Sequence, residues 1–250
     1  MTSSIESQAS ELHAHDVLVH RHHDPHRPSF ALSDVILGGQ DGLVNVLGVI
    51  LGIAAATQDT RIVLAAGLAA TFAESVSMGA VSYTSDLAEH ARYESERERE
   101  YRHLHLVPAV EREEIRNIYQ RKGFAGPLLD QIVDTITADK DVWVGVMMAE
   151  EHQLTPVARG SAVRSALIVG FSAIVGSLIP LAPFLLLPVH AAMAASIVVA
   201  AVSLFTVGAY KARVTIGRPS RSGLEMALIG TLSALAGYVV GLLFRVPGSG

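Results

Sequence analysis

Long apolar runs alternate with polar segments along the chain. A helix needs about 20 mostly apolar residues to cross a bilayer. Five runs reach that length, at residues 35–57, 62–84, 165–187, 189–210 and 224–244. Within the hydrocarbon core the backbone must satisfy its own hydrogen bonds, and a single apolar run does so as a helix. The pattern therefore predicts an all-α membrane protein with five transmembrane helices.

The basic residues between the runs predict the orientation. Cytosolic loops of membrane proteins carry an excess of Lys and Arg. With a cytosolic N-terminus, only Arg61 and Arg245 lie on the far side, and the cytosolic side receives Arg159, Arg164, Lys211, Arg213, Arg218 and Arg221. We therefore expect the N-terminus to be cytosolic, together with the polar segment between the second and third runs.

That polar segment is predicted to be helical. There is no glycine or proline between the second run and Pro108, so one long helix should leave the membrane and continue into water. Three shorter helices should follow. Gly123 is a stop signal for the first, and Pro127 is a start signal for the second. Asp139 is a candidate N-cap for the third, which should run to about Gln153.

The first two runs contain ionisable residues where a lipid-facing helix has none. A charge at the centre of a spanning helix costs about 2.5–3.5 kcal/mol on insertion scales, and such residues usually mark an ion or proton route. Asp41 and Asn45 share a stripe of the first run, and Glu74, Met78 and Ser82 follow each other at four-residue steps on the second. The two stripes can enclose a transport path. The alternative is a buried acid that is hydrogen-bonded to a neighbouring helix.

Metal-ligating residue types also recur at helical spacing in the polar segment. They form three groups: Glu96, Glu100 and His103; Glu111 and Glu114; and Met147, Met148 and Glu151. Carboxylate, imidazole and thioether ligands together suit divalent transition metals better than Mg²⁺ or Ca²⁺. The alternative is a solvated charged helix stabilised by Glu–Arg pairs, with both methionines in a hydrophobic core.

Composition narrows the function classes. The chain of 250 residues has no cysteine, and only 17% of its residues are charged against about 25% in soluble domains. No nucleophile elbow, phosphate loop or zinc-protease helix motif is present, so we expect no enzyme. The polar segment is not a basic patch, which argues against nucleic acid. Six of the eleven histidines lie in the N-terminal tail. A His-rich segment can bind metal ions, and the alternative is a tail without a required function.

Several short motifs resemble one known family. They are Gly-Gly-Gln-Asp-Gly-Leu-Val-Asn at 38–45, Ser-Met-Gly-Ala at 77–80, Thr-Ala-Asp at 137–139 and Met-Met-Ala-Glu-Glu at 147–151. In these motifs, and in five spans with a helical insert after the second, the chain is similar to the vacuolar iron transporter family of divalent-metal/proton antiporters. The resemblance covers nearly everything after about Ser33.

The resemblance implies a homodimer with a transport path between the subunits, and an insert that gathers Fe²⁺ and related ions. By position, the path residues are Asp41 and Met78. The ligands of the insert would be Glu100, His103, Glu111, Glu114, Met147, Met148 and Glu151. Two positions depart from the family pattern, which has glutamate in place of His103 and often a carboxylate in place of Ser82. Glu74 is then the candidate replacement for the missing path carboxylate.

These inferences predict a proton-coupled transporter that moves Fe²⁺ out of the cytosol, with Mn²⁺, Co²⁺ and Zn²⁺ as further candidates. The metal is a substrate, and no prosthetic group is expected. The sixteen Arg against three Lys favour a bacterial plasma membrane over a vacuolar one. The alternatives are a membrane-anchored metal sensor or buffer, and a passive divalent cation channel.

The expected organisation has four parts. They are a His-rich tail without ordered structure (1–32), transmembrane helices 1–2 (33–85), a cytosolic helical metal-binding domain (86–158) and transmembrane helices 3–5 (159–246).

Overall fold

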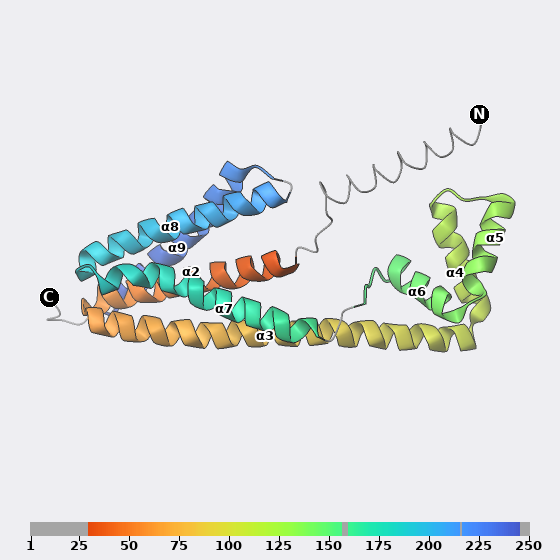
Figure 1. Ribbon diagram of the computed structural model, residues 1–250, viewed down its shortest axis with the longest axis horizontal. Coiled ribbons are helices and arrows are strands. Elements are labelled where there is room, and N and C mark those ends of the chain that lie inside the picture. The colour runs from red at the N-terminus through yellow and green to blue at the C-terminus, as the bar shows by residue number, and fades with distance from the viewer. Residues whose placement is uncertain (1–29, 157–159, 216, 246–250) are drawn as a thin grey trace, which may run out of the picture. The chain divides into compact units, whose positions relative to one another are not determined.

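The computed structural model describes residues 30–156, 160–215 and 217–245, and every regular element in these ranges is a helix (Figure 1). Five helices are long and apolar enough to cross a membrane. They are α2 (Phe30–Thr57), α3 (Thr60–Leu106), α7 (Ser161–Leu181), α8 (Val189–Val214) and α9 (Pro219–Leu243). The five predicted spans are thus confirmed as helices of sufficient length. Almost all of the predicted tail, including its six histidines, lies outside the described residues.

Helix α3 continues far beyond the length of a membrane span. Its N-terminus is capped by Asp59, whose Oδ1 accepts hydrogen bonds from the backbone N–H groups of Arg61 and Ile62 at 2.7 and 3.4 Å. The helix runs for 47 residues to Leu106. It stops there because Pro108 begins the next helix and disfavours helical geometry in the residue before it. The prediction of one uninterrupted helix across this region is confirmed.

Three short helices follow α3, as predicted. They are α4 (Pro108–Arg121), α5 (Gly126–Thr137) and α6 (Lys140–Glu150). The turn after α4 uses Gly123 at φ 97°, a conformation that glycine adopts without steric cost. Asp139 caps α6 by accepting from the N–H groups of Asp141 and Val142 at 2.8 and 3.1 Å. Helix α6 ends three residues before the expected Gln153, whose φ of 54° is incompatible with a continuing helix.

The short helices and the end of α3 share a hydrophobic core. Met147 and Met148 are buried completely in it. They pack with Leu104, Ile115, Ile118, Leu129, Val133, Ile136, Trp143 and Val144. Burial of such a side chain stabilises the fold by about 1.5–3 kcal/mol. Both methionines thus lie in this core, as the alternative interpretation predicts, and their role as metal ligands stays a prediction.

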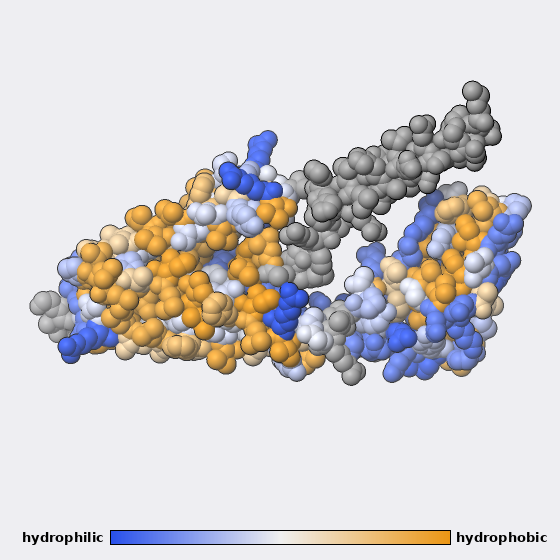
Figure 2. Space-filling model, viewed as in Figure 1, coloured by the Kyte–Doolittle hydropathy of each residue, from blue (hydrophilic) through white to orange (hydrophobic). Residues whose placement is uncertain are grey.

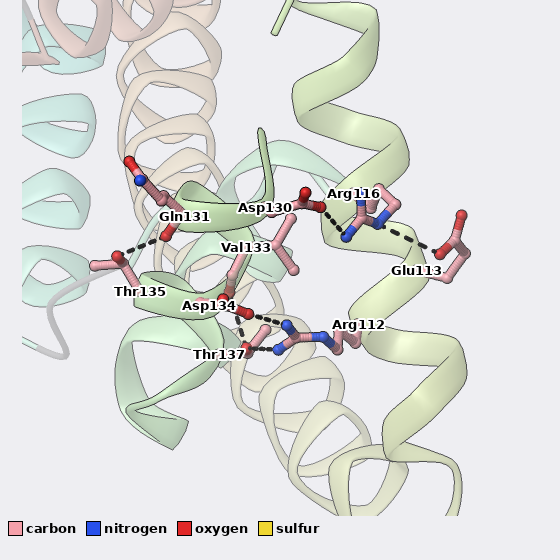
Figure 3. A network of polar contacts seen from close by, with 9 residues as sticks. All are labelled: Arg112, Glu113, Arg116, Asp130, Gln131, Val133, Asp134, Thr135 and Thr137. Carbon is pink, nitrogen blue, oxygen red and sulfur yellow. Dashed lines mark hydrogen bonds and ion pairs between the residues drawn. The ribbon is translucent and has the colours of Figure 1, made fainter. Parts of the chain in front are cut away.

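Paired charges hold α5 against α4 (Figure 3). Arg112 contacts Asp134 and Thr137, and Arg116 contacts Asp130 at 2.6 Å. The two arginines are four residues apart on α4, so both lie on one face of that helix. The two aspartates are likewise four residues apart and lie on one face of α5. Exposed pairs of this kind contribute about 0.2–1 kcal/mol each, so their main effect is to fix the register of the two helices.

Surface character differs sharply between the two sets of helices. Figure 2 shows hydrophobic side chains covering the visible face of the long apolar helices, and hydrophilic side chains gathered over α4–α6. Phe171 of α7 and Leu232 of α9 are among many large apolar side chains that remain exposed in the single chain. A surface of this kind suits lipid or a further protein subunit rather than water.

Glycines bring α2 into backbone contact with α7 and α9. A methyl group at Gly176 of α7 would collide with the carbonyl oxygen of Gly39, and one at Gly241 of α9 would collide with that of Gly52. Small residues allow this close approach, which is a principal source of helix–helix packing in membranes. Two sides of α2 are therefore occupied by neighbouring backbones.

We expect Gly176→Ala to destabilise the protein by about 1–3 kcal/mol, because the added methyl group forces α7 away from α2. Thermal unfolding in detergent measures this change. Gly145→Ala in α6 is the matched control, since nothing lies within 4 Å of its added methyl group. It should stabilise by about 0.5–1 kcal/mol. Equal melting temperatures for Gly176→Ala and the unaltered chain would contradict the packing described here.

Candidate metal sites on helix α3

The first candidate site lies between α2 and α3. The Asn45 side-chain amide donates to Glu74 Oε1 at 3.0 Å, and Asp41 lies close enough to interact with the same carboxyl group. Met78 follows Glu74 by one turn of α3. Asn45 is exposed in the single chain, and Asp41, Glu74 and Met78 are half-buried. The structure therefore brings together Asp41 and Glu74, as the two predicted stripes require.

This arrangement bears on the alternative of a purely structural acid. The hydrogen bond from Asn45 to Glu74 would serve that role equally well. A sealed structural acid, however, would be buried, whereas Asp41 and Glu74 both keep partial exposure. An ion can reach groups of this kind from outside the single chain.

A hydrogen-bond chain links three helices further along α3. Ser82 donates to Ser165 at 3.2 Å, and Ser165 donates to Asp34 Oδ2 at 2.8 Å. The family resemblance implies that a carboxylate often stands at this position in place of Ser82. The structure supplies one from α2 through Asp34. Asp34 was not among the predicted site residues, because it lies just before the predicted first run and shares no helical spacing with Ser82.

The second candidate site is built around Glu100, near the end of α3. Its side chain is only 3% exposed. His103 Nδ1 lies 3.8 Å from Glu100 Oε1 and 3.2 Å from Glu111 Oε1 on α4. One ligand atom from each of these residues lies within 4.8 Å of the others, which is close enough for a shared metal ion. Three predicted ligands from two helices thus meet.

A second group of ligand atoms shares the same glutamate. It comprises Glu100, Glu151 and His152, again within 4.8 Å of one another. His152 Nε2 lies 3.0 Å from Glu100 Oε1. His152 was not among the predicted ligands, because it lies beyond the end of α6, where helical spacing no longer indicates a face. Its position directly after Met-Met-Ala-Glu-Glu was the available signal.

Two carboxylate oxygens in this cluster lack ordinary partners. Glu100 Oε2 and Glu111 Oε2 are buried without a hydrogen-bond donor among the described residues. An unsatisfied buried polar group is costly, more so when charged, and native proteins seldom retain one without reason. A bound cation would satisfy both oxygens.

The electrostatics point the same way. Burial, together with the nearby carboxylates of Glu114 and Glu100, raises the pKa of Glu111 to about 7. Burial also raises the pKa of Glu151, again with a contribution from Glu114. Carboxyl groups with raised pKa values are common at functional sites. Glu114 thus contributes charge to the cluster, although neither ligand group includes it.

The predicted ligand set is therefore divided. Glu100, His103, Glu111 and Glu151 converge with His152, whereas Met147 and Met148 lie in the hydrophobic core. Glu96 was predicted to share a face of α3 with Glu100 and His103. Its Oε2 pairs with Arg99 Nη1 at 3.0 Å. Carboxylate and imidazole ligands in this proportion suit Fe²⁺ and neighbouring divalent transition metals.

Comparison with known proteins relates the chain to a single family. A family profile described as "VIT family" matches residues 32–242. "Vacuolar iron transporter 1" of Oryza sativa subsp. japonica is 33% identical over 221 residues, covering 87% of this chain and 88% of the relative. "Vacuolar iron transporter 1" of Arabidopsis thaliana is 31% identical and covers 82% of each chain. "Vacuolar iron transporter" of Toxoplasma gondii is 30% identical, covering 91% of this chain and 78% of the relative.

The raised pKa of Glu111 predicts a pH-dependent stability in metal-free buffer. Between its ordinary value of 4.5 and about 7, the folded chain binds more protons than the unfolded chain. Stability should therefore fall as pH rises through this window and level off above it. Glu111→Gln removes the ionisable group, so this variant should be more stable than the unaltered chain at pH 8 and similar to it at pH 4.

Thermal unfolding followed by the fluorescence of Trp143 measures this difference, because Trp143 is the single tryptophan and lies in the core of this cluster. Glu113→Gln is the control, since that side chain is 61% exposed on the same helix. It should leave the pH profile unchanged. A stabilisation by Glu111→Gln that is as large at pH 4 as at pH 8 would contradict the assignment.

Proposed function

The chain belongs to the VIT family, whose members are transporters rather than enzymes, and we propose that it exports Fe²⁺ from the cytosol in exchange for protons. The observation that carries the proposal is the cluster of Asp41, Asn45 and Glu74 within two helices that are long enough to span a membrane. A carboxylate inside a membrane-spanning helix has a high free-energy cost, and such residues usually mark a route for ions or protons.

The chemistry of the cluster provides the coupling. A carboxylate can bind a metal ion only when it has lost its proton, so a divalent cation and protons compete for the same oxygens. Metal arrival at Asp41 and Glu74 would expel a proton, and metal departure would allow its return. This competition at one site is sufficient for exchange of the two ions.

The ligand types favour a transition metal. Met78 adds a thioether one turn from Glu74, and thioethers select transition metals over Mg²⁺ and Ca²⁺. The relatives are named as iron transporters, which makes Fe²⁺ the first candidate for this chain. Mn²⁺, Co²⁺ and Zn²⁺ are further candidates, because the same carboxylates accept them.

We assign a collecting role to the cluster around Glu100, in a cytosolic domain formed by residues 86–158. Its carboxylates and imidazoles offer a binding site outside the apolar runs. Glu74 and Glu100 lie on the same helix, 26 residues apart, which corresponds to about 39 Å at the rise of an α-helix. A continuous helix would thus join the collecting cluster to the path.

A second subunit would complete the path. Asn45 is exposed, and Asp41 and Glu74 are half-buried, on a surface that a single chain leaves uncovered. A transported ion needs ligands on all sides and shielding from lipid. A homodimer that pairs these surfaces, as the family resemblance implies, would supply both. We place this dimer in a bacterial plasma membrane with its N-terminus in the cytosol.

Two other functions make different demands on Asp41. A metal sensor or buffer would use the apolar helices only as an anchor, and an anchor does not need a carboxylate, an amide and a second carboxylate between two of its helices. A passive channel would need the carboxylates but no exchange of protons. Transport and coupling can therefore be tested separately.

We expect Asp41→Asn to abolish Fe²⁺ uptake driven by a proton gradient into proteoliposomes, because the amide cannot exchange a proton for a metal ion. Metal influx and internal pH are recorded together. Asp59→Asn is the matched control, since Asn also caps helices well and Asp59 lies in the α2–α3 connection. Gradient-driven uptake at the original rate in Asp41→Asn would rule out the coupling role.

The collecting role makes a different prediction. Glu100→Gln should raise the Fe²⁺ concentration needed for half-maximal transport by about tenfold, as loss of a supporting ligand typically does. The ratio of protons to metal ions should stay the same, because the path residues are intact. A changed ratio with unchanged concentration dependence would assign Glu100 to the path instead.

A further inference from the structure

We propose that His152 is a metal-specificity residue, which completes a second nitrogen-containing subsite on Glu100 and makes the cluster prefer Co²⁺, Fe²⁺ and Zn²⁺ over Mn²⁺. The inference rests on the proposed collecting function. It goes further by adding a ligand and by naming the class of metal that the cluster selects.

The backbone holds His152 in place without help from a bound ion. Its N–H donates to the carbonyl of Met147 at 3.3 Å, and the N–H of Leu154 donates to that of Met148 at 2.9 Å. Gln153 between them adopts a φ of 54°, which turns the chain away from α6. The imidazole is therefore presented to Glu100 by a fixed turn, and little ordering is needed when a ligand binds.

Glu100 lies between two imidazoles. Its Oε1 is 3.0 Å from His152 Nε2 and 3.8 Å from His103 Nδ1. The two ligand groups, Glu100 with His103 and Glu111 and Glu100 with Glu151 and His152, have only this carboxylate in common. Glu100 can therefore serve two adjacent subsites, each with one imidazole and two carboxylates.

A plain hydrogen bond between His152 and Glu100 does not account for the surroundings. It satisfies Oε1, but Oε2 of the same carboxylate remains buried without a donor among the described residues, as does Oε2 of Glu111. Glu151 adds a third carboxylate to the cluster. When these carboxylates are ionised, the cluster carries a negative charge that a divalent cation would neutralise.

The donor set decides which cations fit. Imidazole nitrogen suits iron, zinc and the later transition metals, whereas Mn²⁺, Mg²⁺ and Ca²⁺ are better served by oxygen. With His152 in place each subsite has a nitrogen ligand. Without it, the subsite of Glu100 and Glu151 would have only oxygen ligands. The identity of residue 152 therefore sets the preference of one subsite.

The test measures Co²⁺ and Mn²⁺ binding to the full-length protein in detergent, by equilibrium dialysis for both ions and by visible absorption for Co²⁺. The variant is His152→Gln, whose amide can still donate a hydrogen bond to Glu100 but provides no imidazole. His105→Gln is the control, because His105 is exposed on α3 and belongs to neither ligand group. The histidines of the N-terminal tail are present in every sample and cancel in the comparison.

We expect His152→Gln to weaken Co²⁺ binding by at least about tenfold, because loss of even an outer-shell partner of a metal ligand typically costs about 10–100-fold in affinity. The Co²⁺ absorption bands should change as well. Mn²⁺ binding should change by much less. A second variant, His152→Glu, should strengthen Mn²⁺ binding relative to Co²⁺. Both variants should shift the preference toward Mn²⁺, whereas a general loss of folding would weaken the binding of both ions alike and cannot imitate the pair of results.

Unchanged Co²⁺ affinity and absorption in His152→Gln, with or without a lower melting temperature, would make His152 a structural link between α6 and α3 and would overturn the proposal. Equal losses for Co²⁺ and Mn²⁺ would overturn the specificity role. The transport proposal fails separately. If Co²⁺ binding depends on His152 but the protein moves no metal into proteoliposomes, His152 is supported as a ligand and the proposed transport function is contradicted.

Discussion

A carboxylate withdrawn from water must find a donor, a proton or a cation, and this requirement governs both candidate sites. Glu74 accepts a hydrogen bond from the side-chain amide of Asn45. Glu100 and Glu111 each have a buried oxygen without a hydrogen-bond donor among the described residues. The free energy of such a group is lowered by whichever positive partner arrives. In the proposed function these partners are a metal ion and a proton, so the same constraint would account for both binding and exchange.

Helix α3 gives the two sites a common support. The cap at Asp59 begins it, no proline interrupts it, and it carries Glu74 in its apolar half and Glu100 in its charged half. Around Glu100 the fold uses a small hydrophobic core, with Met147 and Met148 completely buried, to bring α4 and α6 against α3. The core is what converts acidic residues that are distant in sequence into one cluster.

Most of the fold could be predicted because its signals are local. Apolar length, the absence of breakers before Pro108, the glycine at 123 and the cap at Asp139 each act within a few residues. The candidate sites were only partly predictable. Spacing along one helix found Glu100 and His103, but it could not show that Glu151 and His152 approach from the turn after α6, or that Asp34 reaches Ser82 through Ser165. These contacts depend on how the helices pack against one another, and residue spacing along a single helix carries no information about that packing.

The backbone contacts of α2 limit how the path can open. Gly39 lies against α7 and Gly52 against α9, and Asn45 is directed to α3. Turning α2 about its own axis by even one residue, about 100°, would drive a side chain into a neighbouring carbonyl. Helix α2 is thus held on two sides by neighbouring backbones, and a transport cycle of the proposed kind would require motion of the helices around it.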